Sequence, residues 1–142
     1  MELDHNRRVV LLGLAVALLT GLHFAFGTHS HALHVVHVIL GGLYLLPIIA
    51  AAVWFGLEGG LVLAGIVSLV YVMHIRWSWP NQPMENVNQI AMICVYMLVG
   101  AVSGMLVDLQ NRERRRRIEA EQRAQREATL QGFASLCNAL GV

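Results

Sequence analysis

The sequence predicts an all-α membrane protein: four transmembrane helices in an antiparallel bundle, followed by a C-terminal cytoplasmic coiled-coil helix. Hydrophobic residues make up 56% of its 142 residues and charged residues 13%, so the chain is more apolar and less charged than a soluble domain. Four apolar stretches reach the roughly 20 residues that a bilayer core of about 30 Å requires. A long polar segment without proline follows the last stretch and has the composition of a helix.

Short connections join the four apolar stretches and favour antiparallel neighbours in a bundle. No convincing small-residue cleavage site follows the first stretch, so we interpret it as a retained helix rather than a signal peptide. Pro47 lies within the second stretch and is expected to kink it, because proline lacks a backbone N–H. Gly100 and Gly104 on the fourth stretch predict close helix contact within the bundle, with a dimer face as the alternative. The expected spans are about 9–27, 33–56, 59–79 and 86–108.

The arginines predict the orientation of these spans. Arg7 and Arg8 precede the first span, and an arginine cluster at 112–117 follows the fourth. Because cytoplasmic flanks of transmembrane helices are enriched in Lys and Arg, both termini are expected in the cytoplasm. This orientation puts the loops at 28–32 and 76–85 outside and a short turn at Leu57–Glu58 inside. It also accounts for the arginine cluster without nucleic-acid binding.

We divide the chain into a transmembrane domain, 1–108, and a cytoplasmic helix, 109–142. In the cytoplasmic helix, apolar residues recur at alternating spacings of three and four, the a/d pattern of a coiled coil. This pattern predicts a homodimer. The alternative is a single amphipathic helix on the bilayer surface. The seam residues are Leu130, Phe133, Cys137 and Leu140.

Histidines gather at one face of the predicted membrane domain. Six of the seven lie at its outer face: His23, His29, His31, His34, His37 and His74. Ionisable residues inside spanning segments are costly and mark functional sites. Three of the six, His23, His37 and His74, lie about one turn inside three different spans. Together with His34, at the start of the second span, they form the deeper set. We predict that this deeper set binds a ligand, with His29 and His31 as entry or auxiliary groups.

Three interpretations of the deeper histidines remain open. Converging neutral imidazoles suit a transition-metal ion, copper or zinc above all. Two histidines facing each other across helices, such as His37 with His74 or His23, could instead hold a b-type haem. Clustered imidazoles could also form a proton sensor that responds near neutral pH. Ordinary interhelical hydrogen bonding is the structural alternative for each residue.

Other side chains near this depth could assist the histidines. Tyr44 and Tyr71 are placed to orient an imidazole, although plain packing explains them equally well. Further soft or hard ligands could come from Met73, Met84, Glu85, Met92 and Cys94, although methionine in a membrane helix usually serves packing.

Three short segments of the membrane domain stand out together with the arginine-rich exit of the fourth span: Leu43–Ile48, Trp54–Gly56 and Gly59–Gly60. With these segments the chain resembles the N-terminal membrane input region of bacterial sensor histidine kinases. The segment Phe133–Leu140 resembles the stretch that leads into the dimerisation helix of such kinases. A phospho-acceptor box of the His-Glu-x-x-Asn-Pro kind and an ATP-binding region are absent from the sequence. The resemblance therefore implies a sensor truncated before its acceptor histidine, located in a bacterial inner membrane and serving a cytoplasmic kinase domain.

Together these patterns predict a transmembrane sensor module that binds a metal ion and signals to a kinase. The alternative is a haem-binding membrane protein for redox sensing or electron transfer. The sequence contains no hydrolytic triad, phosphate-binding glycine loop or paired-carboxylate arrangement, so we do not expect this chain to be an enzyme.

Overall fold

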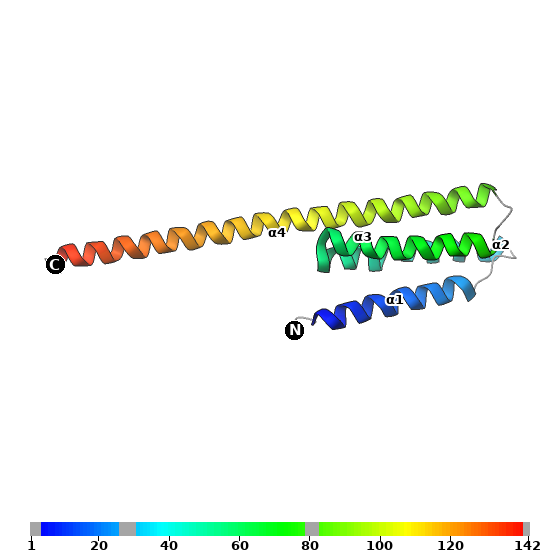
Figure 1. Cartoon of the computed structure of the whole chain (residues 1–142), viewed down its shortest axis with the longest axis horizontal. Helices are drawn as coiled ribbons and strands as arrows, with labels where there is room; N and C mark the ends of the chain where they lie inside the picture. Colours follow the sequence, from blue (N-terminus) through cyan, green and yellow to red (C-terminus); the bar gives the residue numbers. More distant parts are fainter. Residues whose placement is uncertain (1–3, 26–30, 79–82, 141–142) are drawn as a thin grey trace. The chain divides into compact units, whose positions relative to one another are not determined.

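The computed structural model describes residues 4–25, 31–78 and 83–140, and all regular structure in these ranges is α-helical (Figure 1). Its helices are α1 (His5–Ala25), α2 (His31–Leu43), α3 (Leu45–Ser78) and α4 (Pro83–Leu140). The prediction of an all-α chain is therefore confirmed. The chain divides into two compact units, Met1–Val107 and Asp108–Val142.

Three helical stretches are long and apolar enough to cross a membrane: His5–Ala25, Val38–His74 and Gln89–Leu136. Large apolar side chains are exposed along each of them, for example Leu18, Leu69 and Leu98, at 65%, 62% and 64%. In water such surfaces would be unfavourable, whereas lipid tails solvate them. The three stretches indicate a multi-pass membrane protein surrounded by a bilayer.

The helices extend further into two of the expected outer loops than the sequence predicted. Helix α2 begins at His31, and α4 begins at Pro83. Proline is well suited to the first turn of a helix, because the N–H it lacks would have no partner inside the helix there. The expected loops at 28–32 and 76–85 are therefore partly helical within the described residues.

The predicted kink near Pro47 is confirmed as a break between α2 and α3 at Tyr44. Proline at position 47 has no N–H to offer the carbonyl of Leu43, four residues earlier. At the break, the Tyr44 N–H donates to the Gly41 carbonyl at 3.3 Å, a turn one residue tighter than an α-helix. The Ile48 N–H then donates to the Tyr44 carbonyl at 3.3 Å as the helix resumes.

Helix α3 folds back on itself at Gly56. This residue has φ 71° and ψ −153°, a conformation that is open almost only to glycine. A straight helix would separate Tyr44 and Tyr71 by about 40 Å, yet their ring centres are 5.9 Å apart. The two arms of α3, on either side of Gly56, therefore run antiparallel (Figure 1). The turn that was expected at Leu57–Glu58 lies one residue earlier.

Glycines bring α4 into close contact with the second arm of α3. A Cβ added at Gly60 would overlap the carbonyl of Gly100, and a Cβ at Gly104 would overlap the backbone of Leu57. Small residues allow this approach, which is a common way to pack helices in membranes. The interpretation of Gly100 and Gly104 as a contact within the bundle is confirmed.

Helix α1 runs along α3 from the Gly56 end to the opposite end. Near its start, the guanidinium of Arg8 lies 5.8 Å from the centre of the Trp54 ring, and the His5 and Phe55 rings are 5.2 Å apart. Near its end, His23 contacts the arm of α3 that carries Tyr71. The turn at Gly56 and the histidine end are therefore at opposite ends of these helices.

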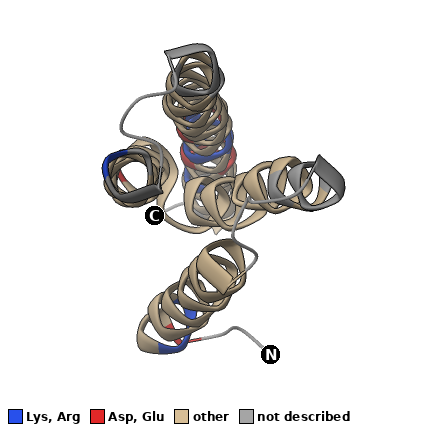
Figure 2. Cartoon of the chain, turned by 90° about the vertical axis from the view of Figure 1, so that its right-hand side faces the viewer, with Lys and Arg blue, Asp and Glu red and all other residues tan. Residues whose placement is uncertain are grey.

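The second unit is the remainder of α4, a single helix in which every side chain described from Leu109 onward is exposed. Arginine and glutamate residues are numerous along it, whereas the apolar parts of the other helices carry few charged residues (Figure 2). Arg117 and Glu113, one helical turn apart, form an ion pair with a nitrogen–oxygen distance of 4.0 Å. Both side chains are strongly exposed, so this ion pair contributes little stability. The predicted helical continuation beyond Asp108 is confirmed.

Candidate functional site

A group of buried polar aromatic side chains lies at the end of the helices opposite Gly56. Its members, which we call the His–Tyr cluster, are His23, Tyr44, Tyr71, His74 and Tyr96. They are between 0% and 4% exposed. They come from α1, the break between α2 and α3, the second arm of α3, and α4. Most of the remaining buried side chains in this unit are aliphatic, so the cluster is its polar centre.

Helical spacing explains how the cluster assembles. Tyr71 and His74 are three residues apart on α3, and Thr20 and His23 are three apart on α1. Residues at this spacing lie on one face of a helix. When the two faces meet, each helix contributes one imidazole and one hydroxyl group to the same region.

The two imidazoles are direct neighbours. The ring centres of His23 and His74 are 4.8 Å apart, with an angle of 68° between the ring planes. Phe24 packs edge-on against His74 at 4.9 Å, and Tyr71 lies 5.2 Å from His23. The pair is thus enclosed by aromatic rings that limit how far either imidazole can move.

The tyrosine hydroxyls form hydrogen bonds within the bundle. Tyr44 donates to Oγ1 of Thr20 at 2.9 Å, which joins the kinked span to α1. Tyr96 donates to the carbonyl of Gly41 at 2.6 Å, which joins α4 to the kinked span. The ring of Tyr71 packs against that of Tyr96, with centres 5.2 Å apart, and the Tyr71 hydroxyl lies beside Gly41. Buried polar groups in a membrane need such partners, because lipid tails offer none.

The structure brings together two of the four histidines of the predicted deeper set, His23 and His74. The backbone of His34 and His37 belongs to α2, one turn apart, but their side chains lie outside the described residues. His29 lies outside them entirely, as does the side chain of His31. Among the described side chains, no group of three or more His, Cys, Asp or Glu residues could hold a metal ion. The described part of the site is therefore a histidine pair.

The other side chains that were expected to assist the histidines differ in whether they lie in the cluster. Tyr44 and Tyr71 do contact an imidazole, with ring centres 6.0 Å and 5.2 Å from His23. Met73 and Cys94 are exposed and do not lie in the buried cluster, so their predicted role as soft ligands is not supported. A methionine one residue before His74 necessarily projects from a different side of the helix.

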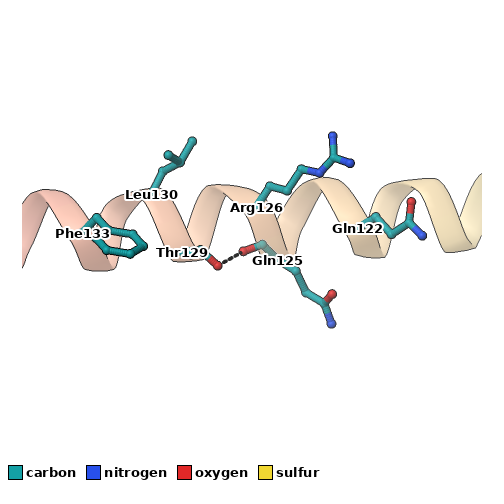
Figure 3. Close-up of a pocket in the computed structure, with 6 residues that line it drawn as sticks. All are labelled: Gln122, Gln125, Arg126, Thr129, Leu130 and Phe133. Atoms are coloured by element: carbon teal, nitrogen blue, oxygen red, sulfur yellow. Dashed lines mark hydrogen bonds between the residues drawn. The ribbon is translucent and has the colours of Figure 1, made fainter.

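A shallow hollow on the C-terminal unit does not form an alternative site. All the side chains that line it come from one helix, as Figure 3 shows: Gln122, Gln125, Arg126, Thr129, Leu130 and Phe133. The hydrogen bond drawn there runs from the Thr129 hydroxyl to the Gln125 carbonyl, 2.8 Å away in the same helix. Side chains of a single helix cannot enclose a ligand.

Sequence reasoning missed Thr20, Gly41 and Tyr96. Tyr96 carries the only hydroxyl among the apolar residues from Ile90 to Val102, and that could have marked it. Its acceptor could not have been found this way, because the Gly41 carbonyl becomes available through the break at Tyr44.

We compared the chain with protein-family models, with curated protein sequences and with solved structures, and none gave a significant match.

Proposed function

We propose that this chain is a transmembrane sensor module that binds a transition-metal ion, copper or zinc, and signals to a cytoplasmic kinase domain. The observation that supports it best is the buried pair of imidazoles from α1 and α3, His23 and His74, with ring centres 4.8 Å apart. Ionisable side chains at such positions in a membrane are costly and are retained for function.

The spacing of this pair suits two ligands of one ion. A metal–nitrogen bond to histidine is about 2.0–2.1 Å long, and the ring centre lies about 1 Å further out. Two ligands at a tetrahedral angle then have ring centres about 5 Å apart, close to the observed 4.8 Å. Two axial ligands of a haem would have ring centres about 6 Å apart with a porphyrin between them. The pair therefore favours an ion over the haem alternative.

The proposal includes two further ligands and a topology. His34 and His37, one turn apart on α2, complete the ion's coordination together with the pair. The middle apolar stretch crosses the membrane twice, because α3 reverses at Gly56, which gives four spans with both termini in the cytoplasm of a bacterial cell. The chain acts as a homodimer through its C-terminal helix, and ion binding favours one arrangement of the spans over another.

Metal analysis and an absorption spectrum on the purified protein, after removal of any histidine tag, test this function. We expect a bound copper or zinc ion and no Soret band. His23→Ala and His74→Ala should each weaken binding more than about 100-fold, because even the loss of an outer-sphere partner weakens metal sites about 10- to 100-fold.

His5→Ala is the matched control, because His5 lies beside Phe55 at the opposite end of the bundle and should not affect binding. A Soret band would support the haem alternative instead. Absence of both metal and haem from protein supplied with them would overturn the proposal.

A further inference from the structure

Helix α4 reaches the His–Tyr cluster through one fully buried side chain, Tyr96. Its ring centre lies 5.2 Å from that of Tyr71 and 6.2 Å from that of Tyr44. The same helix continues to Leu140, well beyond the apolar stretch. Tyr96 is therefore the point at which the helix that leaves the membrane meets the candidate site.

The break in the second span supplies the acceptor for Tyr96. At this break the Gly41 carbonyl accepts the Tyr44 N–H at 3.3 Å and the Tyr96 hydroxyl at 2.6 Å. Gly41 has no side chain in the way: a Cβ there would overlap the Tyr71 hydroxyl and approach that of Tyr96. The absence of a side chain at Gly41 thus leaves room for the Tyr71 hydroxyl beside the residue whose carbonyl accepts from Tyr96.

Tyr71 connects this hydrogen bond to the histidines. Its ring centre lies 5.2 Å from that of Tyr96 and 5.2 Å from that of His23. It also lies one helical turn before His74 on α3. A displacement of the His23 ring, or of the arm of α3 that carries His74, therefore reaches Tyr71 and, through its ring contact, Tyr96.

We propose that Tyr96 is a positioning residue through which ion binding at His23 and His74 acts on α4, by way of Tyr71 and the Gly41 carbonyl. This inference rests on the proposed function, since it requires an ion at the pair. Ion binding draws the two imidazoles into one coordination geometry, and Tyr71 follows His74 because both are on the same arm of α3. The Tyr96 hydrogen bond then favours one position of α4 relative to the kinked span. Packed helices have discrete arrangements, so a small shift at the site changes the population of these arrangements.

The test is amide hydrogen exchange on the purified chain, measured with and without Zn²⁺ in the wild type and in Tyr96→Phe. This substitution removes one hydroxyl and keeps the ring. Ser68→Ala is the matched control, because it also removes a buried hydroxyl from the bundle, one that donates to Ala64 within its own helix at 2.7 Å. Zinc affinity is measured on the same samples by competition with a chelator.

In the wild type and in Ser68→Ala, Zn²⁺ should slow exchange severalfold near His23 and His74, at Gly41–Tyr44 and along α4 around Tyr96. In Tyr96→Phe, zinc affinity should stay within about threefold and the histidine segments should still respond, while the response of α4 is lost. Gly41→Ala displaces the Tyr71 hydroxyl and should have the same outcome: zinc still binds, but it no longer slows hydrogen exchange in α4. A purely structural role for Tyr96 would weaken binding and response together.

The two proposals fail in different ways. If Zn²⁺ binds and slows exchange in α4 equally in the wild type and in Tyr96→Phe, the coupling role of Tyr96 is wrong and the metal site stands. If the wild type binds neither zinc nor copper, the metal site is wrong and the coupling role falls with it.

Discussion

Both units expose apolar side chains, but they differ in whether they also have a buried core. In the first unit, Tyr44, Ile48 and Tyr96 are fully buried between helices of the same chain. In the second, Leu130, Phe133 and Leu140 are 68%, 64% and 75% exposed on a single helix. The first unit can therefore specify its packing within one chain, whereas the apolar side chains of the second are available to a partner. This contrast predicts that substitutions will affect folding in one unit and association in the other.

The largest effect is expected at the contact between α3 and α4 in the first unit. Gly60→Val places a side chain against the Gly100 carbonyl, and backbone cannot move aside as a flexible side chain would. We expect a loss of stability of about 3 kcal/mol or more, at the upper end of overpacking effects. Thermal unfolding in detergent measures it.

Gly65→Val on the same helix is the control, because a Cβ at Gly65 meets nothing within 4 Å. Equal destabilisation by both substitutions would show that the α3–α4 contact is not the cause. A change of oligomeric state without loss of stability in Gly60→Val would assign this glycine surface to a dimer interface instead.

A smaller effect is expected at the reversal of α3. Gly56→Ala forces a side chain into a backbone conformation with φ 71° and ψ −153°, which costs about 1–3 kcal/mol for residues other than glycine. Thermal unfolding of this variant should show that loss. Unchanged stability would mean that α3 does not need this turn, and the proposed double crossing of the middle stretch would lose its support.

The smallest effect is expected in the second unit, where substitutions should change the free energy of dimerisation rather than that of unfolding. Leu130→Ala with Phe133→Ala should weaken dimerisation at least tenfold, or about 1.4 kcal/mol, because both lie on the predicted coiled-coil seam. The unfolding temperature of the first unit should not change. Sedimentation equilibrium in detergent measures the association.

Leu136→Ala is the control for this pair. Leu136 is 60% exposed on the same helix, but it lies outside the a/d seam, so its loss should leave dimerisation almost unchanged. A chain that stays monomeric, or an equal effect of Leu136→Ala, would contradict the coiled coil and favour a helix that lies on the bilayer surface.

Much of the fold could be predicted because it follows from local chemistry. Lengths of apolar sequence identified the spanning stretches, and Pro47 identified the kink, since a missing N–H interrupts any helix. The reversal was expected at Leu57–Glu58 and occurs at Gly56. Its exact position was not predictable, because several glycines nearby can adopt the required positive φ. The count of four spans, in which the middle stretch crosses the membrane twice, stays a proposal.

The candidate site was predictable only in part. His23 and His74 were found because imidazoles are unusual in apolar stretches, and equal depth on neighbouring helices brings them together. The Tyr96–Gly41 hydrogen bond could not be found, since it joins residues far apart in the sequence and uses a backbone carbonyl at a kink. Sequence patterns report side-chain types, and such a bond depends on the tertiary position of the backbone.

X-ray absorption spectroscopy of the zinc-loaded protein tests the metal site most directly, with His74→Ala measured beside the wild type. We expect wild-type zinc to have nitrogen ligands at about 2.0–2.1 Å with the outer scattering of imidazole rings. His74→Ala should bind zinc weakly and show fewer imidazoles. Zinc surrounded by oxygen ligands alone, with the same spectrum in both proteins, would contradict the account.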